Sequence, residues 1–282
     1  MQVYSYIYFS ADMPKINLPA GLNMYYLDEN PAAGMCVLLL HGLGANSDSW
    51  QLQIPVLTQA GFRVLAPDLR SFGRTGFPGS TSIAAMAADC RELLDALQIA
   101  ETVVCGISMG GNVAQQIALD YPQRTTCLVL INTFAHLRPP RLRTWIYFVW
   151  RFILIYLFGL ESQARIVAKS LFPRPDQEIY RHELYQQVIM ADPRGYRATM
   201  LALARFDSRL RLPGLRIPAL IITSSDDTTV PPPLQTELVD LISGARQQIV
   251  PAAGHAVIVE KPEIVNHTLL RFLGNCQSTH LA

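Results

Sequence analysis

Charge is the first thing that this 282-residue sequence has little of. Asp, Glu, Lys and Arg together make up 16% of the residues, and the formal net charge is +1 at pH 7. The chain carries no block of Lys and Arg and no acidic tail. Proteins that bind nucleic acid present basic patches that neutralise phosphates, so this composition predicts no nucleic-acid partner.

Cysteine is also scarce, and none of the five is spaced as part of a C-x-x-C pair. Cys36, Cys105 and Cys127 fall in apolar runs that we expect to be buried strands, and the other two are Cys90 and Cys276. An odd number of scattered cysteines argues against a disulfide framework and against a zinc site. We therefore expect small apolar core residues with free thiols, and a protein of the reducing cytoplasm.

Motifs for cofactors and metals are missing as well. No G-x-G-x-x-G loop follows the first apolar strand, and no H-E-x-x-H spacing occurs. The first pattern cradles the pyrophosphate of a dinucleotide and the second binds zinc on one helix face. The sequence therefore predicts no cofactor and no metal.

Long hydrophobic runs are limited to one segment. Residues 145–158 are apolar apart from Arg151, but fourteen residues are fewer than the roughly 20 that a helix needs to span a bilayer. Residues 1–9 lack the basic region and cleavage site of a signal peptide and fit an outer strand better. We expect a soluble protein, and the apolar segment leaves membrane contact open without favouring it.

Strand and helix signals alternate along the first half of the chain. Short apolar runs at 35–40, 62–66, 102–105 and 126–131 are typical of strands buried on both faces. An amphipathic helix begins after Thr81 or Ser82 and precedes the third of these runs. This order predicts an α/β fold with a mostly parallel central sheet flanked by helices.

The alternation stops for about 80 residues and then resumes. Residues 134–213 look helical and show no strand signal, whereas strands are expected again at 219–223 and 247–250. We interpret residues 1–133 and 214–282 as one α/β core and residues 134–213 as an inserted helical cap. The sequence leaves the oligomeric state open.

Ser108 lies at the centre of a glycine-flanked turn between a strand and a helix. The turn is Gly106-Ile107-Ser108-Met109-Gly110, and an apolar strand and a helical segment lie on either side of it. The pattern G-x-S-x-G in this context places a serine hydroxyl above the sheet, at the positive end of a helix. Ser108 is therefore a candidate nucleophile.

A serine nucleophile needs a base, and the base is best oriented by a carboxylate. Asp226 and Asp227 follow the strand at 219–223, and His255 follows the strand at 247–250. Carboxyl ends of parallel strands meet at one edge of a sheet, which is where open α/β sheets place their sites. The order Ser108, carboxylate, His255 then completes a candidate catalytic triad.

These motifs together resemble the α/β-hydrolase family, in its small capped carboxylesterase-like branch. The resemblance rests on the Ser108 turn, His41-Gly42-Leu43-Gly44, Val230-Pro231 after the acid, and Gly254-His255 with Glu260-Lys261-Pro262. It covers about residues 20–275. The family pattern places the acid four residues before the Val-Pro proline, which selects Asp227 over Asp226, although Ser224 stands where a glycine is usual. The family's other acid position is near Asn132 and holds no carboxylate here.

The resemblance also implies an oxyanion hole and two scaffold roles. The backbone N–H groups of Leu43 and Met109 would bind the oxyanion of a tetrahedral intermediate. His41 would hold the loop that carries Leu43. Asp68 and Arg70 resemble part of a family loop, and we expect them to pair with each other at the rim of the core.

The cap is expected to line the substrate pocket with bulky apolar side chains. Trp145, Phe148 and Phe152 are the candidate substrate-binding residues, although rings of this kind also pack a cap onto a core. They favour a hydrophobic acyl or alcohol group.

The leading hypothesis is therefore a serine carboxylesterase that hydrolyses small to medium apolar esters through an acyl-enzyme. A C–C bond hydrolase or an enol-lactonase could use the same triad, but their substrates carry carboxylates and need a cation in the pocket. Arg141, Arg143 and Arg151 lie in the cap. An interfacial lipase or acyltransferase also stays open, whereas a ligand-binding homologue without turnover is disfavoured because all three triad residues are present.

Overall fold

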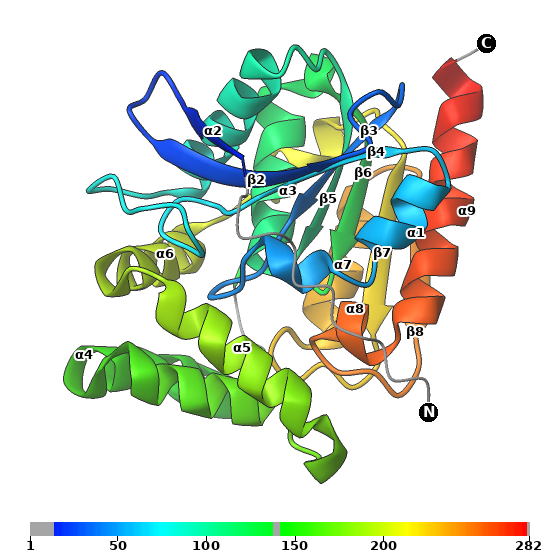
Figure 1. Cartoon of the computed structure of the whole chain (residues 1–282). Coiled ribbons are helices and arrows are strands. Elements are labelled where there is room, and N and C mark those ends of the chain that lie inside the picture. The colour runs from blue at the N-terminus through cyan, green and yellow to red at the C-terminus, as the bar shows by residue number, and fades with distance from the viewer. Residues whose placement is uncertain (1–13, 138–141, 281–282) are drawn as a thin grey trace.

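The computed structural model describes residues 14–137 and 142–280, except for the side chains of residues 142–145, 147, 148 and 277–280. The strand expected at residues 1–9 lies outside the described residues. Within them, eight strands form one sheet in the order β1-β2-β4-β3-β5-β6-β7-β8 (Figure 1). The strands are β1 (Lys15–Asn17), β2 (Asn23–Glu29), β3 (Cys36–Leu40), β4 (Arg63–Pro67), β5 (Thr102–Ile107), β6 (Thr125–Ile131), β7 (Ala219–Ser224) and β8 (Arg246–Val250).

The sheet is mostly parallel. Only the pairs β1–β2 and β2–β4 are antiparallel, and all pairs from β4 to β8 are parallel. The expected parallel sheet is therefore confirmed, and the apolar runs at 35–40, 62–66, 102–105 and 126–131 each overlap a strand, as expected. The hairpin of β1 and β2 is an addition that the sequence analysis did not anticipate.

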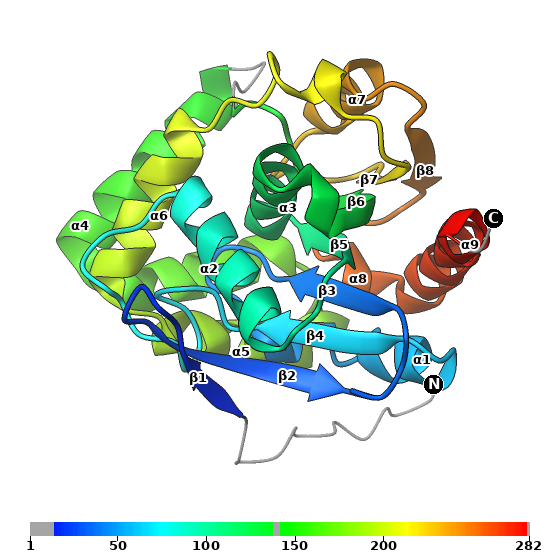
Figure 2. The same cartoon turned by 90° about the horizontal axis from the view of Figure 1, so that it is seen from above.

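Helices cover both faces of the sheet because successive side chains of each central strand point to opposite sides. In β3, Leu38 and Leu40 join one apolar cluster, whereas Val37 and Leu39 join the other. Figure 2 shows the two helix layers. The first layer holds α2 (Ile83–Ala96), α3 (Met109–Asp120) and α7 (Pro232–Leu241), and the second holds α1 (Ile54–Gln59) and α9 (Pro262–His280), with the short α8 (Val257–Glu260) beside it.

Three inserted helices connect β6 to β7 and lie beyond the carboxyl ends of the central strands (Figure 1). They are α4 (Leu142–Leu171), α5 (Glu178–Met190) and α6 (Pro193–Arg205). α4 bends at Gly159, whose φ of 76° and ψ of 179° interrupt the helix. Within the described residues, no helix combines the length and the apolar character that crossing a membrane requires.

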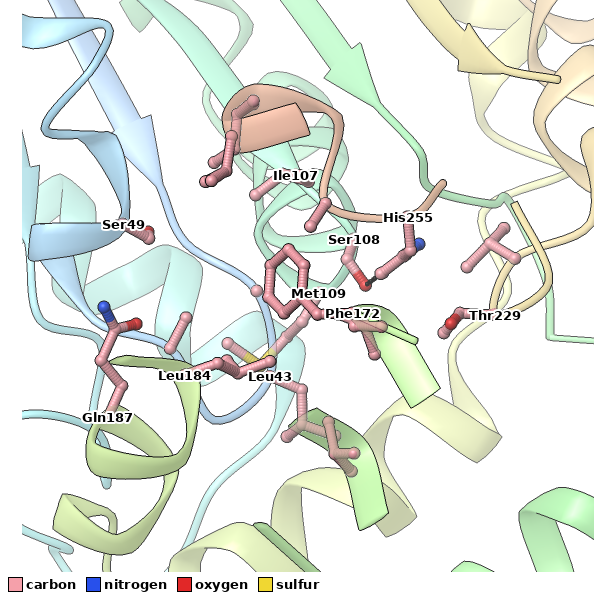
Figure 3. Close-up of a pocket in the computed structure, with 18 of the residues that line it drawn as sticks. Leu43, Ser49, Ile107, Ser108, Met109, Phe172, Leu184, Gln187, Thr229 and His255 are labelled. Carbon is pink, nitrogen blue, oxygen red and sulfur yellow. Dashed lines mark hydrogen bonds between the residues drawn. The ribbon is translucent and has the colours of Figure 1, made fainter. Parts of the chain in front are cut away.

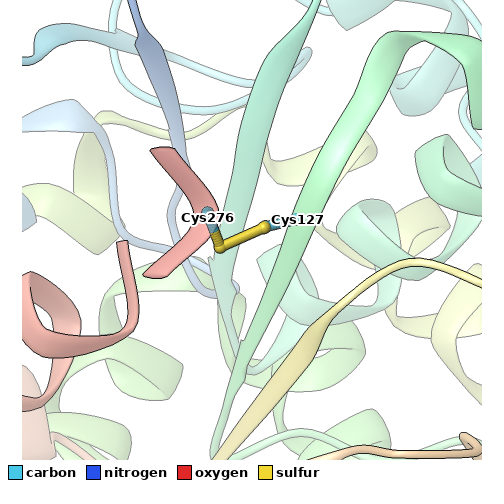
Figure 4. Close-up of a disulfide and its surroundings, with 2 residues drawn as sticks. All are labelled: Cys127 and Cys276. Carbon is cyan, nitrogen blue, oxygen red and sulfur yellow. A yellow bond between two sulfur atoms is a disulfide. The ribbon is translucent and has the colours of Figure 1, made fainter. Parts of the chain in front are cut away.

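Two cysteines form a disulfide, which contradicts the expectation of five free thiols. Cys127 at the start of β6 is bonded to Cys276 on α9 (Figure 4). No spacing in the sequence indicates this pair, because 149 positions separate the two residues and the packing of α9 against β6 brings them together. Cys36, Cys90 and Cys105 are free and buried, as expected.

Asp68 and Arg70 do not pair with each other, so this expectation was wrong. Arg70 forms a buried ion pair with Asp89 on α2. Asp68 accepts hydrogen bonds from the backbone and hydroxyl of Ser47 and from the backbone of Arg74. Each of the two residues therefore has a partner on a different neighbouring segment, and no hydrogen bond or ion pair joins them.

Candidate active site

Ser108 occupies a strained turn between β5 and α3. Its backbone φ of 54° and ψ of −119° lie in a region that residues other than glycine rarely adopt. The flanking glycines make the turn possible, because a Cβ on Gly106 would overlap the carbonyl of Gly110, and a Cβ on Gly110 would overlap the carbonyl of Leu40. Thr133 Oγ1 donates to the Ser108 carbonyl at 2.7 Å and holds the turn against β6.

The structure brings Ser108, His255 and Asp227 into contact in the order expected of a proton relay. His255 Nε2 lies 2.9 Å from Ser108 Oγ (Figure 3). On the other side of the ring, His255 Nδ1 lies 2.7 Å from Asp227 Oδ2. Asp227 and His255 are both buried. The carboxylate fixes the tautomer with a proton on Nδ1, so that Nε2 accepts from the serine hydroxyl.

Asp227 is held on both of its oxygens. Oδ1 accepts from the backbone N–H groups of Thr229 and Val230 at 2.8 and 2.9 Å, and Oδ2 accepts from Gln235 Nε2 at 3.0 Å as well as from His255. Asp226, the rival acid, is exposed and its Oδ1 accepts from the hydroxyl of Ser225. The spacing to Val230-Pro231 therefore selected the carboxylate that contacts the histidine.

Asn132 ties together the loops that carry the acid and the base, a role that sequence reasoning missed. It follows β6 with a φ of 44° and is fully buried. Its Oδ1 accepts from the Ser224 backbone at 3.0 Å, while Nδ2 donates to Ser224 Oγ and to the His255 carbonyl, both at 2.9 Å. Its position after a central strand was the only signal available, and the sequence analysis considered it only as a place for a missing carboxylate.

Leu43 and Met109 both line the pocket over Ser108 (Figure 3). Met109 is the first residue of α3, and the first backbone N–H groups of a helix have no partner within it. His41 Nδ1 lies 2.8 Å from the carbonyl of Gly42, and Nε2 accepts from the Leu69 backbone at 3.0 Å. Complete burial lowers the pKa of His41, so it acts as a neutral brace for the peptide that precedes Leu43.

A pocket of about 150 Å³ lies over Ser108 and is walled on its far side by the inserted helices. A cavity of about this volume holds a molecule the size of benzene. Phe172, Leu184 and Gln187 lie around it in Figure 3. The walls are mainly apolar, and the side chains from the inserted segment include Val167, Leu171, Tyr180 and Leu203.

Of the three expected substrate-binding residues, the structure describes the side chain of Phe152 alone. Phe152 packs, half-buried, against the larger apolar cluster, and the pocket wall does not include it. The side chains of Trp145 and Phe148 lie outside the described residues. The phenylalanine and tyrosine rings that line the pocket are Phe134 after β6, Phe172 directly after α4, and Tyr180 on α5.

Two ionisable side chains enter this apolar pocket from the inserted helices. Arg151 on α4 is 5% exposed and donates to the Tyr196 hydroxyl at 3.0 Å. The amide oxygen of Gln163, in its favourable orientation, accepts from Arg151 Nε and Nη2 at 2.8 Å. Glu183 on α5 is half-buried, and burial raises the pKa of its carboxyl to about 7.

This geometry supports nucleophilic acyl transfer. A serine hydroxyl in contact with a buried His–Asp pair can lose its proton as it attacks a carbonyl, and backbone N–H groups beside it can bind the resulting oxyanion. Among the residues that the structure describes, no cluster of three or more His, Cys, Asp or Glu side chains could hold a metal ion.

Comparisons with known proteins agree with this fold. A family model described as alpha/beta hydrolase fold matches residues 36–262. A putative carbamate hydrolase, RutD, of Variovorax paradoxus is 32% identical over 259 residues, covering 89% of this chain and 96% of that protein.

Two solved structures are also similar to this chain. The enol-lactonase of Burkholderia xenovorans LB400 has a TM-score of 0.84 at 26% identity, over 93% of this chain and all of that one. A thermophilic esterase of Thermogutta terrifontis has a TM-score of 0.81 at 28% identity, over 94% of this chain and 99% of that one. One of these structures is named an enol-lactonase and the other an esterase, so the comparisons support a hydrolase and do not identify its substrate.

Proposed function

Because the chain belongs to the alpha/beta hydrolase fold family and is a hydrolase, we propose that it is a serine carboxylesterase that acts on small to medium apolar esters. The observation that carries this proposal is the continuous contact from Ser108 Oγ through His255 to Asp227 at the floor of an apolar pocket. The type of nucleophile also matters. An aspartate in place of Ser108 would form an alkyl ester on its carboxylate, whereas a serine forms an acyl-enzyme, so the serine favours acyl transfer.

In the proposed mechanism, Ser108 Oγ attacks the ester carbonyl while His255 Nε2 takes its proton. The backbone N–H groups of Leu43 and Met109 stabilise the oxyanion, and His255 then protonates the leaving alcohol. Asp227 orients the imidazole and stabilises its charged form. Water, activated by His255, hydrolyses the acyl-enzyme and restores the free serine.

The inserted helices would act as the cap in this mechanism. We propose that residues 134–213 form the cap domain and the remainder forms the core, because α4 and α5 supply the far wall of the pocket and the core loops supply its floor. The oxyanion loop contacts the cap directly, since a Cβ on Gly44 would lie 2.9 Å from a methyl group of Val188. The substrate would be held between the two parts.

A second candidate function, an enol-lactonase or a C–C bond hydrolase, is favoured by Arg151. Substrates of these enzymes carry a carboxylate, and a guanidinium that is 5% exposed in an apolar pocket would bind it more strongly than one in water. The activity assay therefore includes an enol lactone with a free carboxylate beside its methyl ester. Preference for the free acid would support this second function.

The test is hydrolysis of p-nitrophenyl esters of increasing acyl length, with a p-nitrophenyl carbamate included. We expect turnover of the shorter esters, and a loss of about 10⁴-fold or more in kcat/KM for Ser108→Ala. Substitution of the exposed Ser170 by alanine is the matched control and should leave turnover unchanged. A fluorophosphonate should label the wild type once per chain and should not label Ser108→Ala. Unchanged turnover in Ser108→Ala would contradict the proposal. So would a wild type that neither hydrolyses the esters nor reacts with the fluorophosphonate.

A further inference from the structure

The first half of α4 presents a continuous apolar stripe to solvent. Ile146, Val149, Trp150, Ile153 and Leu157 are spaced so that they share one helix face, and their exposed fractions range from 42% to 71%. α4 lies at the outer edge of the inserted helices in Figure 1. We refer to these five residues as the α4 stripe.

Such a concentration of exposed apolar side chains is a feature of this helix. Among the described residues, seven of the fourteen large hydrophobic side chains that are exposed lie between Ile146 and Phe158. The opposite face of the same helix is packed, since Arg151 and Ile155 are buried. Contiguous apolar surface of this kind marks an interaction site, because single exposed side chains would be scattered over the molecule.

The charged residues that surround the stripe in the sequence have one sign. The sequence contains no Asp or Glu between Asp120 and Glu161, whereas arginines stand at positions 138, 141 and 143, immediately before the stripe. On the neighbouring α6, the Arg197 guanidinium lies 5.3 Å from the ring centre of Tyr156, beside the stripe. An apolar helix face with aromatic rings and arginines, and without carboxylates, complements an anionic lipid surface.

A second copy of the chain fits this face less well. In a two-fold dimer each stripe would meet the same stripe of its partner, and the two Arg197 guanidinium groups beside the stripes would be brought together. Anionic headgroups would instead neutralise them. We propose that the α4 stripe binds the surface of a membrane that contains anionic lipids, with the helix lying in the plane of the interface.

This orientation has a direct consequence for the pocket. α4 carries the stripe on one face and contributes Arg151, Val167 and Leu171 to the pocket wall from others. A molecule held by the stripe would keep its pocket close to the lipid surface. The inference concerns where the molecule binds, and it is independent of whether Ser108 hydrolyses esters.

The proposal is tested by sedimentation with vesicles. Vesicles of phosphatidylcholine alone are compared with vesicles of phosphatidylcholine and phosphatidylglycerol in equal parts. We expect the wild type to sediment with the anionic vesicles and to be released as the salt concentration rises. The double variant Ile153→Glu, Leu157→Glu should lower the fraction bound by at least about tenfold, since it places two carboxylates in the apolar face.

The double variant Leu210→Glu, Ile249→Glu is the matched control. It makes the same change in charge at two exposed apolar side chains outside the inserted helices, and it should bind as the wild type does. Thermal unfolding of each variant, without vesicles, shows that the fold is intact.

Three outcomes would overturn the proposal. The first is a wild type that stays in the supernatant with both kinds of vesicle. The second is equal loss of binding in both double variants. The third is a dimer in solution that the stripe substitutions dissociate, because a second copy would then be the occupant of this face.

Discussion

Asn132 couples the two halves of the candidate relay at the scale of a single residue. Its amide contacts the end of β7, which leads to Asp227, and the loop that carries His255. Asn132 therefore bridges the two segments whose side chains, Asp227 and His255, lie 2.7 Å apart. Asn132 is a positioning residue, since it does not line the pocket over Ser108.

Asn132→Ala should lower kcat more than it changes KM. Loss of the tether leaves the Ser224 N–H and the His255 carbonyl without this partner, and a misplaced base slows the chemical step by roughly 10- to 100-fold. The measurement is the steady-state kinetics of a short p-nitrophenyl ester. Asn266→Ala is the control. It removes a hydrogen bond from another side-chain amide, to the Leu52 carbonyl, which contacts neither Asp227 nor His255, and it should lower stability without this effect on kcat. Equal kcat values for Asn132→Ala and the wild type would show that the tether is unnecessary.

Glu183 makes the stability of the protein depend on pH. Burial raises the pKa of this carboxyl to about 7, above the value near 4.3 that a glutamate has in an unfolded chain. The folded protein therefore binds this proton more tightly than the unfolded chain does. The contribution of the protonated carboxyl to the free energy of unfolding is complete below about pH 4 and is lost as the pH rises through 7. Glu183→Gln cannot ionise, so its melting temperature should exceed that of the wild type at pH 8 and equal it near pH 4.

The control for Glu183 is Glu178→Gln, an exposed position in the first turn of the same helix. It should show no gain in melting temperature at pH 8. A melting temperature of Glu183→Gln that follows the wild type at every pH would contradict the assignment of this carboxyl as the titrating group.

At the scale of elements, the disulfide joins α9 to the sheet. In the chain-entropy account, a cross-link that closes a loop of 100 residues or more stabilises the folded state by roughly 4–5 kcal/mol. Cys276→Ser should therefore lower the free energy of unfolding by up to about this amount. Reductant should lower the melting temperature of the wild type and have no comparable effect on Cys276→Ser.

Counting thiols provides an independent check on this bond. Three cysteines are free, so denatured but unreduced protein should take up three equivalents of an alkylating reagent, and reduced protein should take up five. Five equivalents without reduction would show that the disulfide is absent.

The elements that the sequence predicted are those with strong periodic signals. The central strands read as continuous apolar runs because they are buried on both faces, and α2 begins after Ser82, whose hydroxyl accepts from the Ala85 backbone as an N-cap. β2 was missed. It lies near the edge of the sheet, between β4 and the three-residue β1, and mixes buried with half-exposed residues, so its pattern is weaker than that of β3 or β5.

At the scale of the whole molecule, the fold and the contacts of the candidate site could be anticipated because the motifs follow successive strand ends. Ser108, Asp227 and His255 lie far apart in the sequence, and a parallel sheet gathers its strand ends at one edge. Their catalytic roles stay a prediction until the kinetics are measured. The pocket wall could not be anticipated, since the rotation of each inserted helix decides which side chains face inward.

The disulfide also bears on where the protein resides. The sequence predicts a cytoplasmic location because its cysteine pattern predicts five free thiols. The bond between Cys127 and Cys276 removes that argument, since disulfides persist mainly in oxidising compartments. Location must therefore be established by fractionation of cells, independently of the cysteine pattern.

The same bond gives the polypeptide a covalent ring. The stretch from Cys127 to Cys276 is closed on itself, and it contains the inserted helices, Asp227 and His255, whereas Ser108 lies outside it. A protease that cuts once within the ring, for example at the 98% exposed Leu210, leaves every atom tied to a single molecule. The nicked chain would run as one band on a denaturing gel without reductant and as two fragments after reduction. The ring thus protects the assembly of the site against the loss of a peptide bond.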